Sequence, residues 1–236
     1  MASLKNWDNK TWLSSTKYIK LFNNFILKQK RLNKNSQILD IGCGRGKIIA
    51  NLFDRINLAN KPIGIDIENH KDKSKKIIFK NTDALSFISK TKLNFDLILI
   101  KQTIHLLKKK EIKTLLSNCK SKLNVNGKII ILSLDPEKNE IPTFFLMKKK
   151  LHKSLKRDES YFDLIKKNYP KIIIKKFIFK VKISKIKYIQ MIKKRYISTL
   201  LNFNDKQIAD GLIEIKNKYK KELKFKDRLI CLIIKN

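Results

Sequence analysis

Residues 38–48, Ile-Leu-Asp-Ile-Gly-Cys-Gly-Arg-Gly-Lys-Ile, form the stretch that decides the fold. An apolar run containing one acid leads into three glycines at alternate positions, and an apolar run then resumes. This order predicts a buried strand, a tight turn and the first turn of a helix. Glycine has no Cβ, so such a turn can adopt unusual dihedral angles and let a ligand approach the bare backbone. Open α/β sheets bind their ligands at turns of this kind, at the carboxyl ends of parallel strands.

The spacing of the glycines distinguishes this turn from a dinucleotide-binding turn. The dinucleotide fingerprint requires G-x-G-x-x-G, whereas here the third glycine is Gly46 and position 47 is lysine. Counted from Asp40, the pattern is D-x-G-x-G-x-G. In this respect the sequence resembles the class I S-adenosylmethionine-dependent methyltransferases, whose first motif has this form. The resemblance covers about residues 36–134, with a looser match to residue 236.

Short apolar segments alternate with helical or loop segments along the chain. Nearly all residues of these segments are apolar, which is typical of parallel strands buried on both faces. We predict an α/β fold with a doubly wound, mostly parallel, seven-stranded sheet, as in the Rossmann-like methyltransferases that the sequence resembles. The predicted strands are 37–41, 62–67, 76–79, 95–100, 128–134, 172–183 and 227–234. We also predict a turn at 124–127 and two short amphipathic helices at 144–155 and 161–169.

The chain carries no internal repeat and no Pro/Gly/Ser-rich linker, so we expect a single domain over residues 1–236. Its predicted parts are an N-terminal helix or lid (1–35), a cofactor-binding core (36–134), a substrate-covering helical cap with the sixth strand (135–200), and a C-terminal helix with the last strand (201–236). The only tryptophans, Trp7 and Trp12, precede the first helix. They indicate either a lid over the pocket or simple packing of that helix on the sheet.

The formal net charge of +35 has two explanations. One is a polyanionic partner such as RNA, DNA or an anionic membrane surface. The other is compositional drift, because 49 of the 55 basic residues are lysine, whereas phosphate recognition favours arginine. We favour drift, so nucleic acid is a possible but not a favoured partner. The sequence does not indicate an oligomeric state.

The localisation expected from the sequence is cytoplasmic. No apolar run approaches the roughly 20 residues that span a bilayer, and residues 1–20 show no secretory signal. The three cysteines are odd in number and widely spaced, which favours free thiols in a reducing compartment.

Acidic residues stand at the ends of the first three predicted strands. Right-handed crossovers place the carboxyl ends of parallel strands on one rim, so these residues should meet. The donor implied by the resemblance is S-adenosylmethionine. Asp40 would stabilise its cationic methionine end, Asp66 would accept from both ribose hydroxyls, and Asp83 would accept from the adenine amine. Ile67 and Ala84 would supply flat apolar contact, although each acid alone could equally be a helix cap.

The resemblance assigns the cofactor-binding positions residue by residue. The matching positions are Asp40, Gly42, Gly44, Asp66 and Asp83, with Lys101 where the backbone would meet the methionine moiety; Gly46, Ile67 and Ala84 complete the expected cofactor-binding set. His105 is the best candidate for a general base, since it begins the helix after the fourth strand; its alternative role is packing or substrate shaping. Neither the cysteines nor the histidines have metal-ligand spacing, so we expect no metal site.

Three functions stay open at this point. The first is methyl transfer to a small-molecule acceptor, whose pocket residues 136–200 would shape. Arg195 and Tyr196 would contact an anionic acceptor group or lie on a solvated helix face. The second is an RNA methyltransferase acting on ribose or a ring carbon, because residues 100–103, Ile-Lys-Gln-Thr, lack the proline and aromatic residues typical of amine-methylating enzymes on nucleic acids. The third is a protein that binds the cofactor without catalysis.

Overall fold

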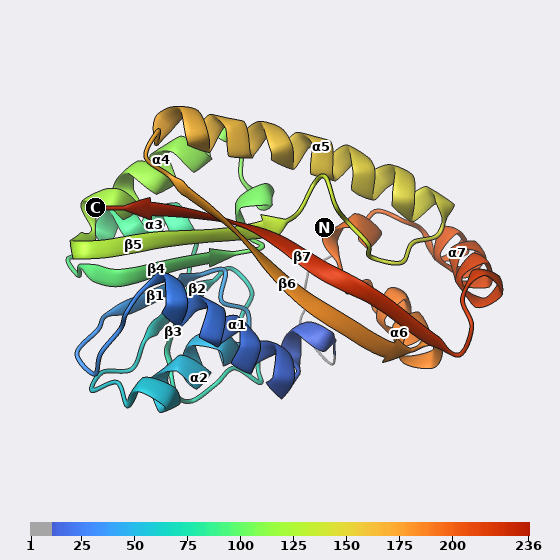
Figure 1. Cartoon of the computed structure of the whole chain (residues 1–236), viewed down its shortest axis with the longest axis horizontal. Helices are drawn as coiled ribbons and strands as arrows, with labels where there is room; N and C mark the ends of the chain where they lie inside the picture. Colours follow the sequence, from blue (N-terminus) through green and yellow to red (C-terminus); the bar gives the residue numbers. More distant parts are fainter. Residues whose placement is uncertain (1–10) are drawn as a thin grey trace.

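The central strand of the fold is β1 (Ile38–Ile41), which lies inside a seven-stranded sheet of order β3-β2-β1-β4-β5-β7-β6. Figure 1 shows the computed structural model, which describes residues 11–236. Trp7 lies outside the described residues. The other strands are β2 (Ile63–Asp66), β3 (Ile78–Asn81), β4 (Phe95–Lys101), β5 (Leu123–Leu134), β6 (Ile173–Ser184) and β7 (Glu222–Lys235).

Strands β1 to β5 are parallel, and β7 runs antiparallel to both β5 and β6. The predicted seven-stranded, mostly parallel sheet is therefore confirmed. Strands β1, β2 and β4 are short and mostly buried because helices cover both faces of the sheet there, whereas β3 at the edge of the sheet is largely exposed. The helices are α1 (Thr16–Gln29), α2 (Lys47–Ile56), α3 (Ala84–Lys90), α4 (Lys109–Ser121), α5 (Phe145–Asn168), α6 (Lys185–Lys193) and α7 (Asp205–Lys218). Short 3-10 turns are η1 (Trp12–Ser14), η2 (Ile104–Leu106) and η3 (Ser198–Leu200).

The sheet divides the core into two halves, and helices cover each half. On one face of the sheet, α1 and α2 pack together, and on the other face α3 and α4 do so (Figure 1). Beyond the parallel strands, β6 and β7 continue as a long antiparallel pair from Ile173↔Ile233 to Ser184↔Glu222. The helices α6 and α7, which connect these two strands, gather at the far end of the pair, and α5 runs from that end back towards α4 (Figure 1).

The prediction of two short helices at 144–155 and 161–169 is wrong, because residues 145–168 form the single helix α5. The buried side chains of this helix include Leu151, Leu155, Asp158 and Phe162, spaced by three or four residues. The stripe of buried residues is thus continuous. A charged residue occupies one of its positions, and that is why the apolar periodicity appeared to break.

The prediction of a turn at 124–127 is also wrong, since these residues belong to β5. The pairing partner of Phe95 is Leu123, whereas the partner of Leu97 is Lys128, so the intervening residues bulge out of the ladder. Asn126 adopts a φ of 62° there. Residues 124–127, whose composition is typical of a turn, therefore form a bulge within strand β5. The third strand also begins at Ile78, two residues later than predicted.

Candidate active site

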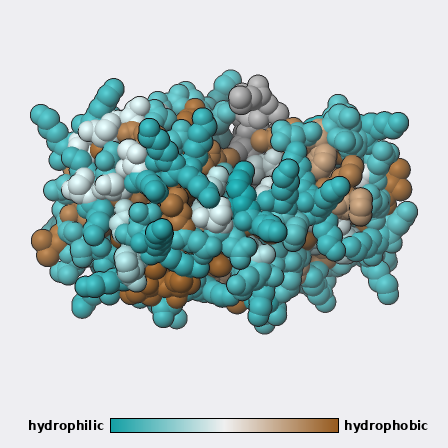
Figure 2. All heavy atoms as spheres, turned by 90° about the horizontal axis from the view of Figure 1, so that it is seen from above, coloured by the Kyte–Doolittle hydropathy of each residue, from teal (hydrophilic) through white to brown (hydrophobic). Residues whose placement is uncertain are grey.

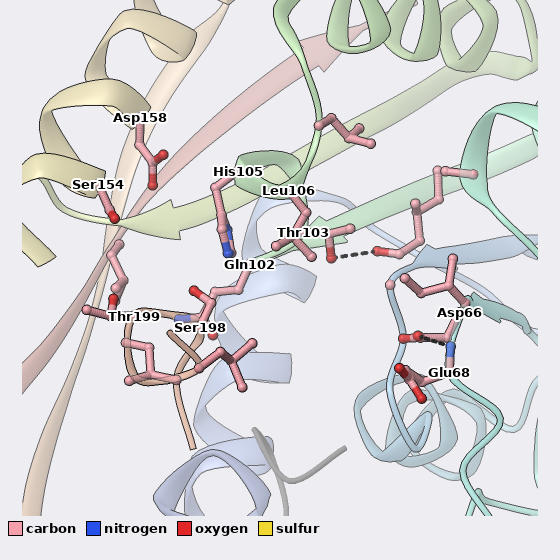
Figure 3. Close-up of a pocket in the computed structure, with 18 of the residues that line it drawn as sticks. Asp66, Glu68, Gln102, Thr103, His105, Leu106, Ser154, Asp158, Ser198 and Thr199 are labelled. Carbon is pink, nitrogen blue, oxygen red and sulfur yellow. Dashed lines mark hydrogen bonds between the residues drawn. The ribbon is translucent and has the colours of Figure 1, made fainter. Parts of the chain in front are cut away.

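A cavity of about 790 Å³ lies at the carboxyl ends of β1, β2 and β4. Its volume is in the upper part of the range for small-molecule sites, about 300–1,000 Å³. In Figure 3, Asp66 and Glu68 lie on one side of it, whereas His105, Ser154, Asp158, Ser198 and Thr199 gather on the other. The second group comes from η2, from α5 and from the segment around η3. The cavity therefore has a strand-end side and a side formed by later parts of the chain.

The glycine turn forms part of the cavity wall at Gly42, whose φ is +73°. A Cβ at this position would overlap Thr103, lying 2.7 Å from its Cγ2 and 2.9 Å from its Cβ. The N–H groups of Gly42 and Cys43 both donate to the carbonyl of Ile65, at 2.9 and 3.0 Å. The turn is thus tied to β2 and packed against the residue that follows β4.

The other two glycines of the motif lie behind this wall. Gly46 precedes α2 with a φ of +69°, and a Cβ there would overlap the side chain of Ile77. Gly44 donates its N–H to Oδ2 of Asp66 at 2.8 Å. Neither glycine lines the cavity, so in this structure Gly46 serves packing and Gly44 serves the position of Asp66.

Asp66 ends β2 and lies on the cavity wall, as do the predicted contact residues Ile67 and Ala84. Its second oxygen, Oδ1, accepts the N–H of Glu68 at 2.9 Å. Asp83, also on the wall, is the N-cap of α3 and accepts from Ser86 N at 2.9 Å. Hydrogen bonds from Ser86 lower the pKa of the Asp83 carboxyl. A carboxylate that caps a helix can still face a ligand with its other oxygen.

Asp40 and Lys101 do not line the cavity. Asp40 is 2% exposed, and burial raises the pKa of its carboxyl to about 7, against the opposing effect of the Lys101 charge. Lys101 is buried as well, with its Nζ 5.3 Å from the centre of the Tyr18 ring and 5.6 Å from that of Phe22. Both charged residues therefore act on the cavity from behind the strand ends.

Trp12 connects the start of the described chain to the last strand. Its Nε1 donates to Oδ2 of Asp227 at 2.9 Å, and its ring meets Tyr196 and Phe225 edge-on. Trp12 and Asp227 both line the cavity. The other oxygen of Asp227, Oδ1, is buried and has no hydrogen-bond partner in the part of the chain that the structure describes. The prediction of a lid remains a prediction, although Trp12 does form part of the wall.

On the other side of the cavity, α5 contributes two charged groups, Asp158 and Arg157, which form an ion pair. Both hydrogen bonds from Arg157 go to Oδ1 of Asp158, at 2.9 Å from Nη2 and 3.2 Å from Nε. Burial raises the pKa of Asp158 despite this ion pair. His105 faces the same space (Figure 3), and burial together with the Arg157 charge lowers its pKa to about 4. The imidazole is therefore neutral at pH 7.

Several residues of the cavity were missed by sequence reasoning. Ser154, Asp158 and Thr199 are among them, and for Asp158 the signal was present as an acid at a buried position of an amphipathic helix. Arg195 lies elsewhere, bonded to Asp205 at 2.8 Å and to the carbonyl of Phe203 at 3.0 Å. Tyr196 is buried on the wall, with its hydroxyl 3.1 Å from that of Tyr188. An anion-binding role for Arg195 is not supported by this geometry.

Cys43, Cys119 and Cys231 are buried, and none of them forms a disulfide in the part of the chain that the structure describes. Within residues 11–236, no group of three or more His, Cys, Asp or Glu side chains could hold a metal ion. In the same range, no helix has the length and apolar character needed to cross a membrane.

A mostly parallel seven-stranded sheet whose strand-end acids and glycine turn meet at a large cavity has the architecture of a class I methyltransferase. The family model of the methyltransferase domain matches residues 32–226, and the chain belongs to this family. No curated protein sequence matches the chain.

Solved structures similar to this one are methyltransferases too. One is the plantazolicin methyltransferase BpumL in complex with a pentazolic desmethylplantazolicin analogue and S-adenosylhomocysteine. Its sequence is 18% identical and its TM-score is 0.54; the alignment covers 98% of this chain and 88% of the BpumL chain. Another, from Anabaena variabilis, is described as a methyltransferase from an antibiotic biosynthesis pathway, with 16% identity, a TM-score of 0.62, and coverage of 89% of this chain and 95% of its own. At these identities the likeness concerns the fold.

Proposed function

We propose that the protein transfers a methyl group from S-adenosylmethionine to a small-molecule acceptor. The observation that carries this proposal is the two-sided cavity, in which strand-end acids face polar side chains of α5 and η3 across an apolar interior. Family membership supports the reaction class. Similar structures that hold S-adenosylhomocysteine, the product of the donor, support the choice of cofactor.

The residues on the strand-end side fit such a donor chemically. Gly42 presents bare backbone on the cavity wall, so no side chain stands between the β1 turn and a ligand. A Cβ at this position would also overlap Thr103, which lines the same cavity. The Asp66 carboxylate, already fixed by two backbone N–H groups, would hold the ribose hydroxyls. Asp83, with Ile67 and Ala84, would hold the adenine. Asp40, whose pKa of about 7 leaves it only partly ionised at neutral pH, would favour the cationic methionine end in its ionised form.

When bound, S-adenosylmethionine supplies an activated methyl group on a sulfonium. The remaining task of the protein is to orient the acceptor in line with that methyl group, and such orientation can provide most of the acceleration. The neutral imidazole of His105 can accept a hydrogen bond from the acceptor. With a pKa of about 4, His105 is a weak base at neutral pH, so we assign it an orienting role before a proton-removing one.

Isothermal titration calorimetry with S-adenosylmethionine and S-adenosylhomocysteine tests this proposal. Both should bind, and Asp66→Ala should weaken binding by about tenfold or more, because hydrogen bonds to charged groups contribute about 1.5–3 kcal/mol. The matched control is Asp163→Ala, which removes an acid whose side chain is 66% exposed on α5, and it should leave the affinity unchanged. Absence of binding by both compounds would refute the proposal.

A further inference from the structure

The charges that line the cavity have the opposite sign from those of the protein as a whole. The chain has 55 basic and 20 acidic residues, and hydrophilic side chains cover most of the face seen in Figure 2. Among the described residues, however, the cavity wall contains six acids, one arginine and no lysine. The acids are Asp66, Glu68, Asp83, Glu111, Asp158 and Asp227. Negative charge on the wall of an apolar cavity attracts cations and hydrogen-bond donors and repels carboxylates and phosphates.

The cationic donor accounts for only part of this charge. Asp66 and Glu68 lie on the strand-end side, whereas Asp158 lies across the cavity beside Ser154 and His105 (Figure 3). The Asp158 side chain is 10% exposed, and within residues 11–236 its Oδ2 receives no hydrogen bond, because both bonds from Arg157 go to Oδ1. The acceptor side therefore has a carboxylate oxygen that remains available to a ligand.

A second carboxylate oxygen on the same wall also lacks a partner. Oδ1 of Asp227 is buried without a hydrogen bond from any described residue, and the whole residue is 1% exposed. A buried carboxylate oxygen in that state costs free energy unless a ligand donates to it. In each of these two carboxylates one oxygen thus accepts a hydrogen bond from the protein and the other does not, and a ligand rich in N–H groups would supply the missing donors.

We propose that the methyl acceptor is an amine on an otherwise apolar molecule, and that the Asp158 carboxylate beside His105 binds its nitrogen. This inference rests on the proposed methyl transfer and specifies its substrate class. Attack needs the neutral amine, which has a free lone pair; burial against the apolar wall favours this form, whereas the Asp158 charge favours the ammonium form and aids its binding. The Asp158 carboxylate and the neutral His105 imidazole both accept N–H hydrogen bonds, so they would leave that lone pair directed away from them.

The chemical balance is simple. The amine releases one proton to water on becoming neutral. In the transfer, a nitrogen–carbon bond forms while the donor's sulfur–carbon bond breaks and the sulfur keeps the electron pair. The methylated nitrogen is then positively charged, and Asp158 stabilises that charge as it develops. No oxidant, metal or further reactant is required.

Binding of matched probes tests the substrate class without measuring turnover. Benzylamine and 4-phenylbutylamine are each compared with the alcohol and the carboxylate of the same carbon skeleton, by calorimetry on the full chain saturated with S-adenosylhomocysteine. We expect each amine to bind about tenfold or more tightly than its carboxylate counterpart. This preference would oppose the net charge of +35, which by itself attracts the carboxylates.

Two variants test whether Asp158 causes the preference for amines over carboxylates. Asp158→Asn should reduce it by about tenfold, whereas Glu159→Gln, which removes the same charge from an exposed position of α5, should leave it within about twofold. Equal binding of amines and carboxylates by the wild type, no binding of either amine, or equal effects of the two variants would overturn the inference. Binding of S-adenosylhomocysteine is recorded first, so a failure limited to the amines leaves the proposed methyl transfer standing.

Discussion

The substitution Gly42→Ala tests the structure of the glycine turn most directly. Its φ of +73° lies in the left-handed region, where a residue with a Cβ costs about 1–2 kcal/mol more than glycine. The new Cβ would lie 2.7 Å from Cγ2 of Thr103, and overpacking of this kind costs about 1–3 kcal/mol. The free energy of unfolding should therefore fall by about 2–5 kcal/mol, a large part of a typical total of about 5–15 kcal/mol.

Urea denaturation followed by circular dichroism measures this loss, and calorimetry with S-adenosylhomocysteine measures its effect on the site. The companion substitution Thr103→Ala removes the Oγ1 and Cγ2 atoms that the new Cβ overlaps. In a double-mutant cycle it should restore about 1–3 kcal/mol of the loss and leave the backbone strain in place. A Gly42→Ala protein within about 0.5 kcal/mol of the wild type, or a cycle without coupling, would refute the reasoning.

Three further predictions concern buried groups. The pKa of Asp40 is raised from 3.8 to about 7 in the folded protein, so the free energy of unfolding should fall as pH rises from about 4 to about 7. Urea denaturation across this range measures the fall, and the substitution Asp40→Asn should flatten it. Trp12→Phe leaves Oδ2 of Asp227 without its donor and should cost about 1–3 kcal/mol in the same assay; an unchanged urea midpoint would contradict this. Alanine is a better helix former than glycine by about 1 kcal/mol, yet Gly211→Ala should destabilise α7, because its Cβ would lie 2.6 Å from the Phe144 ring. A higher melting temperature for this variant would show that the Phe144 ring moves away to make room.

Much of the parallel sheet could be predicted from the sequence. Strands β1, β2 and β4 are short, mostly apolar runs, and this pattern has few alternatives once helical segments separate the runs. The rule that carboxyl ends of such strands share a rim then brought Asp66 and Asp83 to one cavity. Local pattern and chain topology agree in this part of the protein.

The acceptor side could not be predicted in the same way. Asp158, which lines the cavity from α5 together with Arg157, interrupts the apolar periodicity of this helix and so conceals its full length in the sequence. The contact between Trp12 and Asp227 joins residues 215 positions apart, and no local pattern encodes such a pairing. The bulge near Asn126 depends on the register between β4 and β5, which the turn-like composition conceals.

The contact between Trp12 and Asp227 also has a consequence for the order of folding during synthesis. The ribosome produces the parallel strands first, yet the wall of the cavity needs β7, and one core cluster joins α1 to β6 and β7. Contacts between segments so distant in sequence form late, because the chain between them must be ordered first. The nascent chain would therefore expose the apolar faces of β5 and α1 until residue 227 has left the ribosome, and a chaperone that shields them would act in that interval.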